Sequence, residues 1–153
     1  MDKKTPLPNM LVQSGQGRVV RAFGDEAIFH LEAQHTGGTL TMWTSNITQP
    51  GGGPPPHYHV NEDEWWIVQE GRVSFLLDGK WQEVPLGAVV FSPRGCVHTF
   101  KNIGDKPSRV LIQTSPSGFE KFFTRCAEEF CKPGGPNMER IVQISAEHGI
   151  HYV

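Results

Sequence analysis

Three histidines and a glutamate in this chain have a spacing that suits a shared metal ion. His57 and His59 are one residue apart, and alternate side chains of an extended segment point to the same face, so both imidazoles would face one way. Glu64 follows at the head of an apolar segment, and His98 supplies a third imidazole. Imidazole nitrogens and a carboxylate oxygen that converge from neighbouring strands are ligands of divalent transition metals. These residue types therefore predict a metal site.

The carboxylate ligand has three candidates in one acidic run, Glu62, Asp63 and Glu64. Glu64 is the predicted ligand because it shares the strand alternation of Trp66 and Val68. We expect Glu62 and Asp63 to lie in a solvated turn.

The same alternation predicts the surroundings of the metal. If Glu64 and His98 face inward, then Trp66, Val68 and Phe100 face inward as well, and Lys101 faces away. No cationic side chain is placed to bind a phosphate. We therefore expect these three apolar residues to contact an aromatic or otherwise apolar ligand.

Short segments rich in β-branched and aromatic residues follow one another from residue 18 to about residue 115. Turn sequences such as Gly37-Gly38 and Asp78-Gly79 separate them, without an intervening helical pattern. This arrangement predicts an all-β fold, a small antiparallel β-barrel or jelly roll. The expected strands are 18–23, 27–32, 39–46, 72–77, 80–84, 88–92, 97–101 and 108–114.

The period of the apolar residues changes to that of a helix after residue 117. Ser117 and Glu120 have the spacing of a capping box, and a second helix is expected from an Asn137 cap to about Gly149. We expect these C-terminal helices, about 117–149, to pack on the barrel and the apolar face of the first to line its mouth. That face contributes the predicted substrate contacts Phe119, Phe122 and Phe123.

Composition excludes several classes of function. The chain has 153 residues, which fits a single domain over 1–153, and a formal net charge of −2 gives no footprint for nucleic acid or an anionic membrane. No apolar run approaches the roughly 20 residues that cross a bilayer, and residues 1–10 do not resemble a signal peptide. Three cysteines without a paired spacing favour a reducing compartment, so we expect a cytoplasmic protein.

Two motifs identify a family resemblance. The first reads G-x5-H-x-H-x4-E-x6-G from Gly51 to Gly71, and the second reads G-x5-P-x-G-x2-H-x3-N from Gly87 to Asn102. Together they resemble both signature motifs of the cupins at every position. The resemblance implies a small antiparallel barrel that holds one divalent transition metal. Its ligands would be His57, His59, Glu64 and His98, and manganese, iron, cobalt, nickel, copper and zinc are all acceptable to such a donor set.

Within the cupins, the segment from Gly51 to Gly71 is similar to that of quercetin-dioxygenase-like, single-domain members. This resemblance implies a dioxygenase that acts on a small aromatic or enolisable compound. Glu64 would then be the catalytic base as well as a metal ligand.

Two other functions remain compatible with the sequence. One is a metal-dependent isomerase or lyase that uses the same Lewis acid without oxygen, and the other is a non-catalytic protein that binds a small molecule. Family members commonly pair through N-terminal strands, so we also expect a homodimer in which residues 18–46 form the contact.

Overall fold

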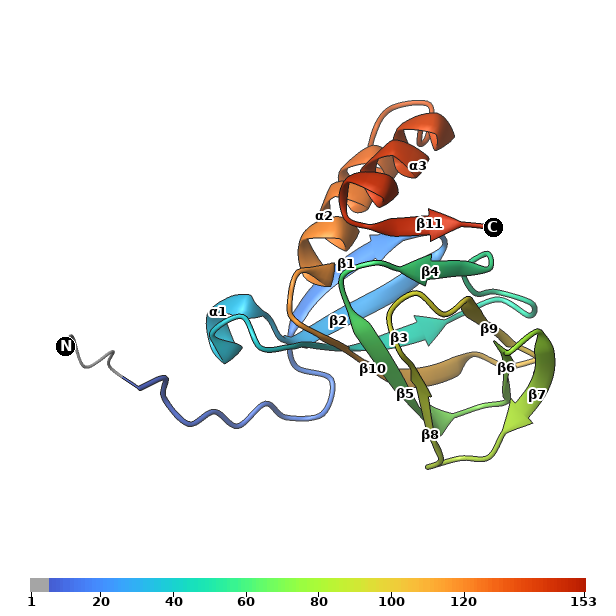
Figure 1. Cartoon of the computed structure of the whole chain (residues 1–153), viewed down its shortest axis with the longest axis horizontal. Helices are drawn as coiled ribbons and strands as arrows, with labels where there is room; N and C mark the ends of the chain where they lie inside the picture. Colours follow the sequence, from blue (N-terminus) through green and yellow to red (C-terminus); the bar gives the residue numbers. More distant parts are fainter. Residues whose placement is uncertain (1–5) are drawn as a thin grey trace.

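Two antiparallel sheets form the body of the computed structural model, which describes residues 6–153 (Figure 1). The six-stranded sheet has the order β1 (Arg18–Ala22), β2 (Asp25–Leu31), β3 (Thr41–Ile47), β10 (Ser108–Ser115), β5 (Asp63–Glu70) and β8 (Val89–Ser92). The five-stranded sheet has the order β11 (Ile150–Tyr152), β4 (His57–His59), β9 (His98–Asn102), β6 (Val73–Leu77) and β7 (Lys80–Val84). The predicted all-β jelly roll is confirmed.

Side-chain alternation fills the space between the sheets. Along β5, Glu64, Trp66 and Val68 are buried whereas the residues between them are partly exposed, as the sequence pattern predicts. Register aligns Phe29 with Trp43, Trp43 with Ile112 and Ile112 with Trp66. This row of large buried side chains crosses four neighbouring strands, and it forms the layer of the core directly next to Glu64.

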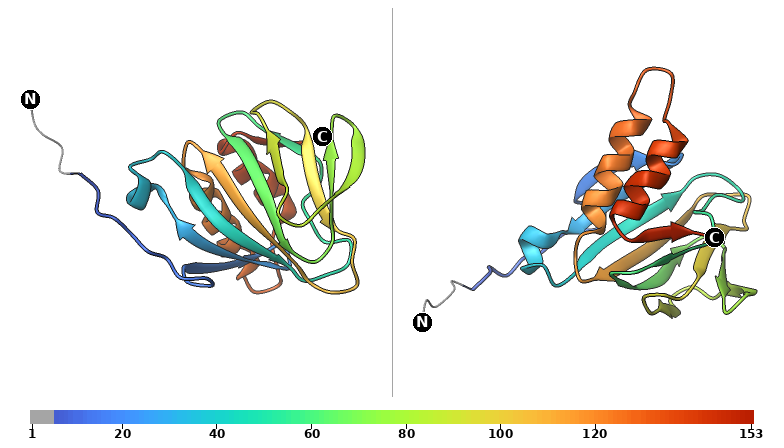
Figure 2. Two further views of the ribbon diagram at one scale, coloured as in Figure 1. Left: turned by 90° about the horizontal axis from the view of Figure 1, so that it is seen from below. Right: turned by 45° about the horizontal axis from the view of Figure 1, so that its top comes forward.

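Two C-terminal helices, α2 (Phe119–Phe130) and α3 (Met138–Glu147), form a hairpin beside the barrel (Figures 1 and 2). The Asn137 cap is confirmed, because its side chain accepts a hydrogen bond from the backbone N–H of Arg140. The prediction of a Ser117 capping box is wrong. Gly118 is the N-cap residue of α2, and its backbone N–H donates to Glu120, whose carboxylate turns toward the barrel.

Glu120 connects the start of α2 to the barrel. One carboxylate oxygen accepts a hydrogen bond from the backbone N–H of Ala33, 3.0 Å away, and the other accepts from the Thr41 hydroxyl. Ala33 begins α1 (Ala33–Thr36), a short helix between β2 and β3 that the sequence pattern does not predict. Burial would raise the pKa of Glu120, but these hydrogen bonds outweigh it and lower the pKa below its ordinary value.

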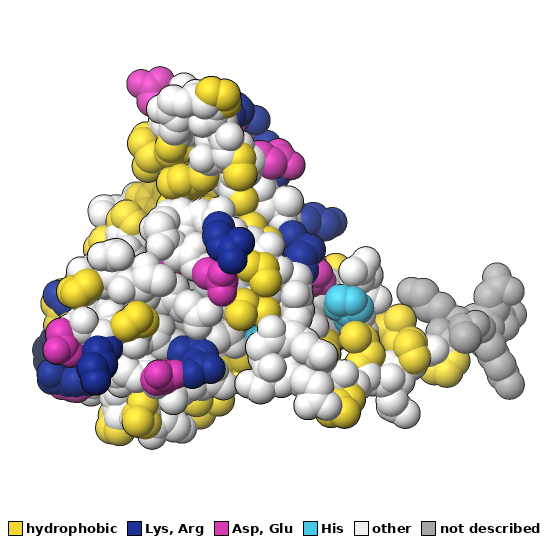
Figure 3. All heavy atoms as spheres, turned by 180° about the vertical axis from the view of Figure 1, so that it is seen from behind, with side chains coloured by type: hydrophobic (Ala, Val, Ile, Leu, Met, Phe, Trp, Pro, Cys, Tyr) yellow, Lys and Arg dark blue, Asp and Glu magenta, His cyan; other side chains and the backbone are white. Residues whose placement is uncertain are grey.

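Charged side chains of both signs are mixed at the surface of the described residues (Figure 3). Lys and Arg side chains lie among Asp and Glu side chains on the face shown in Figure 3. Exposed ion pairs such as Arg21–Glu26 and Arg72–Glu83 have the same mixed character. None of the helices described is long and apolar enough to cross a bilayer.

Candidate metal centre

The structure brings the four predicted ligands together at one end of the barrel interior. His57 and His59 lie on β4, Glu64 on β5 and His98 on β9, and all four are buried. One ligand atom from each lies within 4.8 Å of the others. The carboxylate oxygen Oε2 of Glu64 is 3.1 Å from His98 Nε2 and 3.3 Å from His59 Nε2. Sheet register produces this meeting, because His57 is paired with His98 across β4 and β9.

Hydrogen bonds at Nδ1 fix the rings of His57 and His98. His57 Nδ1 lies 2.8 Å from the carbonyl oxygen of Pro55. His98 Nδ1 lies 3.0 Å from both the Ser92 hydroxyl oxygen and the Cys96 carbonyl oxygen. A backbone carbonyl can only accept, so Nδ1 of each ring carries a proton, which leaves Nε2 as the possible ligand atom. His98 Nε2 lies 3.1 Å from the Glu64 carboxylate, and a metal bound at Nε2 would replace a proton held there.

Glu62 holds the third ring, which corrects the prediction that it lies in a solvated turn. Its Oε2 lies 3.2 Å from His59 Nδ1, and the residue is only 6% exposed. Asp63 fits the prediction better, since it pairs with Arg94 at the surface. Side-chain alternation could have indicated this burial, because Glu62 lies two positions before Glu64 and so faces the same side of an extended segment. Ser92 was missed as well, and its register partner across β5 and β8 is Glu64.

The pKa shifts of His57, His59 and Glu64 also suit a site that binds a cation. Burial and the neighbouring His98 lower the pKa of His57 to about 4, so this imidazole is neutral near pH 7. Burial would raise the pKa of Glu64, but the imidazoles of His59 and His98 outweigh it and lower that pKa, so the carboxylate is ionised. For His59, burial lowers the pKa, whereas the carboxylates of Glu64 and Glu62 raise it to a greater extent. A cation placed among these groups would replace the proton that His59 otherwise attracts.

One buried nitrogen, His59 Nε2, indicates that the cluster could bind an added ligand such as a metal ion. His59 Nε2 is fully buried and has no hydrogen-bond partner among residues 6–153, because the nearby Glu64 oxygen does not have the required geometry. Such an orphaned nitrogen is costly unless something binds it. Three Nε2 atoms and one carboxylate match the nitrogen–oxygen donor set of a divalent transition metal. The residues present therefore fit a metal ion.

A small apolar cavity opens onto this cluster. Its volume is about 130 Å³, and His57 and Glu64 form part of its wall. Four of the predicted substrate contacts also line it, namely Phe100, Phe119, Phe122 and Phe123. Residues that the sequence reasoning did not assign to the site include Asp25, Ile150 and Tyr152.

Two predicted substrate contacts, Trp66 and Val68, lie in the core outside the cavity wall. Both are 1% exposed, and neither is among the residues that line the cavity. The Trp66 ring is 5.0 Å from the His98 ring, and its indole N–H has no acceptor within the described part of the chain. Both residues pack in the core next to the cluster, and their predicted role in substrate binding stays a prediction.

Phe119 joins the helical hairpin to the cluster. Its ring stacks on Trp43 at 4.3 Å and lies parallel to the His59 ring at 5.9 Å. Phe122 packs against Phe119 at 5.2 Å. The first turn of α2 therefore places aromatic surface against the His59 side of the cluster.

Comparisons with known proteins agree with the fold. The family model described as "Cupin domain" matches residues 47–113, a range that contains all four cluster residues. This range is less than half of the chain and lies within the two-sheet jelly roll, so both the sequence and the fold are similar to those of cupins.

Individual relatives cover part of the chain. Polyketide synthase CurC of Streptomyces cyaneus is 33% identical over 80 residues, which are 52% of each chain. Germin-like protein 2-4 of Oryza sativa subsp. japonica is 35% identical over 81 residues, 50% of this chain and 35% of that one. The chain spans about half the length of the first curated relatives that it matches.

Solved structures show the fold alone. The polyketide cyclase RemF from Streptomyces resistomycificus superposes with a TM-score of 0.61 at 22% identity, covering 72% of this chain and 81% of that one. A predicted oxalate decarboxylase from Thermotoga maritima also gives 0.61, at 21% identity, covering 70% of this chain and 99% of that one.

Proposed function

We propose that this protein is a metal-dependent dioxygenase that acts on a small aromatic or enolisable compound. The observation that carries the proposal is the four-residue cluster beside an apolar cavity, with His57 and ionised Glu64 in the cavity wall. A divalent transition metal in the site would act as a Lewis acid toward a substrate oxygen and, if redox-active, would supply electrons to dioxygen.

The chain's own residues would prepare the substrate. Phe100, Phe119 and Phe122 would bind its apolar body and orient its acidic C–H or O–H group toward Glu64. Glu64 would accept that proton at a carboxylate oxygen, and burial would keep water from competing for the same proton. His59 would keep its ring fixed through Glu62 while charge develops on the substrate.

A second candidate is an oxygen-independent lyase, isomerase or cyclase that uses the same proton transfer. The names of two similar proteins, a polyketide synthase and a polyketide cyclase, favour this alternative. A non-catalytic binding protein is disfavoured by the complete ligand cluster beside the cavity.

Oxygen uptake separates these functions. Metal-loaded protein would be incubated with a panel of flavonols and 1,3-diketones while dissolved oxygen and substrate are both followed. Oxygen consumption equal to substrate loss supports the dioxygenase. Substrate loss that continues under strict anaerobiosis supports the second candidate, and substrate binding without loss in either condition supports a binding protein.

We also propose that the protein is a homodimer. Supporting this, a groove of about 360 Å³ lies on the outer face of β2, β3 and β10, next to the segment 10–15. Apolar side chains in the groove, including Ile28, Met42 and Leu111, offer a surface that a second copy could cover. Light scattering should give about twice the chain mass of 17.1 kDa, and a mass of 17.1 kDa at micromolar concentration would exclude the dimer.

A further inference from the structure

The last strand of the chain lies against the strand that carries two of the metal ligands. β11 pairs antiparallel with β4 at three positions, Ile150 with His59, His151 with Tyr58, and Tyr152 with His57 (Figure 1). The ladder extends at both ends through the bonds Val60 N to Gly149 O, 2.7 Å, and Val153 N to Pro56 O, 3.1 Å. The whole segment 56–60 is therefore held by residues near the C-terminus.

The opposite side of β4 has fewer backbone connections. Register links it to β9 at one position, His57 with His98, and one further bond joins Gly95 N to His59 O at 2.7 Å. One side-chain bond adds to these, because the Thr99 hydroxyl of β9 donates to the carbonyl of Pro54, in the proline segment before β4. The segment that carries His57 and His59 therefore has more backbone connections to β11 than to the sheet interior, although the carbonyl of His59 itself bonds to Gly95 on the interior side.

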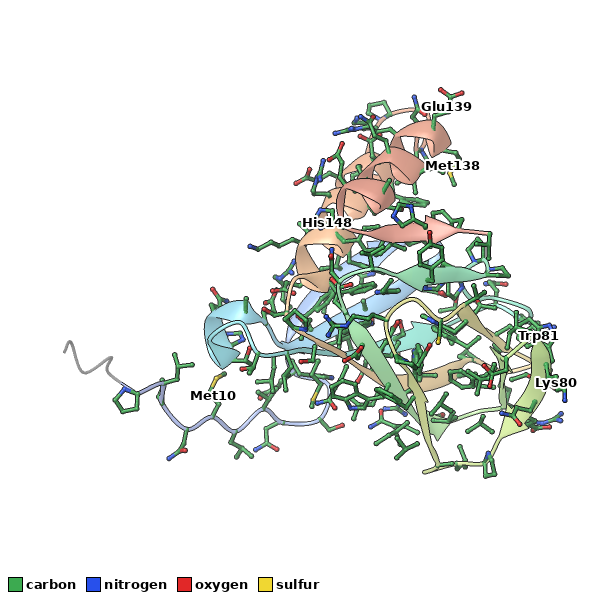
Figure 4. The ribbon with its side chains drawn as sticks, in the orientation of Figure 1. Met10, Lys80, Trp81, Met138, Glu139 and His148 are labelled. Carbon is green, nitrogen blue, oxygen red and sulfur yellow. The ribbon has the colours of Figure 1, made fainter. Side chains whose placement is uncertain are left out.

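β11 also connects β4 to the helical hairpin and to the cavity. Ser145 of α3 donates its hydroxyl proton to the Ile141 carbonyl, so the Tyr152 hydroxyl, 3.1 Å from Ser145 Oγ, donates to that oxygen. Ile150 and Tyr152 both line the cavity. Figure 4 shows His148 at the end of α3, where the chain turns into β11. The carbonyl of His148 accepts a hydrogen bond from the Asn61 side chain, 3.1 Å away.

We propose that β11 is a positioning element of the metal centre, which rests on the proposed metal site. By holding β4 in the sheet, it fixes the two imidazoles of His57 and His59 and closes the cavity wall with Ile150 and Tyr152. Metal binding and the docking of β11 onto β4 then stabilise each other, since linkage between two events is reciprocal. The C-terminal hairpin is in this way coupled to the metal although none of the four ligands lies on it.

Gly149 allows this coupling to be tested with a matched control. Its φ of +74° is unfavourable for a side chain, and a Cβ there would meet the Asn61 side-chain nitrogen at 2.5 Å and Val60 Cβ at 3.4 Å. Gly134, in the turn between α2 and α3, has a similar φ of +86° with no described atom within 4 Å of an added Cβ. Gly149→Ala and Gly134→Ala therefore share the backbone strain, and only the first disturbs the junction with β4.

A second variant acts on the ladder itself. Antiparallel pairs alternate between hydrogen-bonded and non-hydrogen-bonded positions, and the bonds at Val60 and Val153 make Tyr58 and His151 the hydrogen-bonded pair. His151→Pro removes that donor while it keeps the side chains of Ile150 and Tyr152.

The experiment measures Co²⁺ affinity by calorimetry and amide exchange by mass spectrometry in each full-length variant. We expect Gly149→Ala and His151→Pro to speed exchange of residues 57–60 in the metal-free protein and to weaken Co²⁺ binding about tenfold, the effect of disturbing the support of a metal ligand. Gly134→Ala should match the wild type in both measurements. Co²⁺ should also slow exchange of residues 150–153 in the wild type.

Two results would overturn the inference. One is unchanged exchange at residues 57–60 in folded Gly149→Ala protein, and the other is a loss of Co²⁺ affinity in Gly134→Ala as large as in Gly149→Ala. If His151→Pro fails to fold, Gly149→Ala decides. A wild type that does not bind Co²⁺ contradicts the proposed metal site, whereas exchange in the metal-free variants still decides whether β11 holds β4.

Discussion

Replacing Glu62 tests whether a buried carboxylate next to a ligand tunes the metal centre. Its Oε2 accepts the hydrogen bond of His59 Nδ1 at 3.2 Å, and the residue is 6% exposed. Among the described residues, Glu62 is the only carboxylate that contacts an Nδ1 atom in the cluster, and the other groups are backbone carbonyls and the Ser92 hydroxyl. Its charge therefore increases the basicity of His59 in addition to orienting the ring.

The expected magnitude follows from this arrangement. Loss of such a partner typically lowers metal affinity about 10- to 100-fold, which corresponds to about 1.4–2.7 kcal/mol of binding free energy. Glu62→Gln keeps an oxygen that can accept from Nδ1 and removes only the charge, so we expect a loss near tenfold. Glu62→Ala removes both and should approach 100-fold.

Calorimetric titration of the metal-free variants with Co²⁺ measures this loss, and urea unfolding shows whether each variant is folded. Asp63→Asn is the matched control, because it removes a neighbouring carboxylate that pairs with Arg94 at the surface. It should leave Co²⁺ affinity unchanged. A folded Glu62→Ala protein that binds Co²⁺ as tightly as the wild type would refute the reasoning.

Three further predictions concern the base, the cavity wall and the anchor of α2. Glu64→Gln should keep part of the Co²⁺ binding and lose most turnover of any substrate found, because an amide cannot accept the proton; normal turnover would exclude Glu64 as the base. Phe122→Ala, at a residue 4% exposed, should lower the free energy of unfolding by about 3 kcal/mol while metal stoichiometry stays unchanged, and a loss of metal would contradict this. Glu120 has a pKa below the ordinary 4.5, so its stabilisation is present above about pH 4.5 and is lost as pH falls through the lowered pKa. Glu120→Gln should thus destabilise the protein by about 1–3 kcal/mol at pH 7 and by less at pH 3 in urea unfolding, and an equal loss at both pH values would contradict the assignment.

The meeting of His57, His59 and Glu64 in one cluster could be predicted from sequence because it depends on local spacing. Alternation places His57 and His59 on one face and puts Glu64 at the head of an inward-facing row. The order of short strands and turns likewise predicts the jelly roll, since each hairpin depends on nearby residues. The prediction for Glu62 is wrong because its side chain, two positions before Glu64, turns inward to His59 although the residue lies next to a turn.

Features that depend on distant parts of the chain could not be predicted in the same way. β11 has three residues and pairs with β4, about 90 positions earlier, so no local pattern identifies it as a strand. α1 is a four-residue helix, too short to show helical periodicity. Ser117 has the spacing of a capping residue, but Glu120 binds Ala33 and Thr41 in the barrel, and this tertiary contact moves the cap to Gly118.

The central claim is that the cluster binds a metal, and elemental analysis tests it most directly. The protein would be purified without chelators and without metal-affinity resin, alongside His59→Ala as a folded comparison. The account predicts about one divalent transition metal per wild-type chain and a large loss of metal in His59→Ala. Wild-type protein that is consistently metal-free and does not take up Co²⁺, or His59→Ala protein with the wild-type metal content, would contradict it.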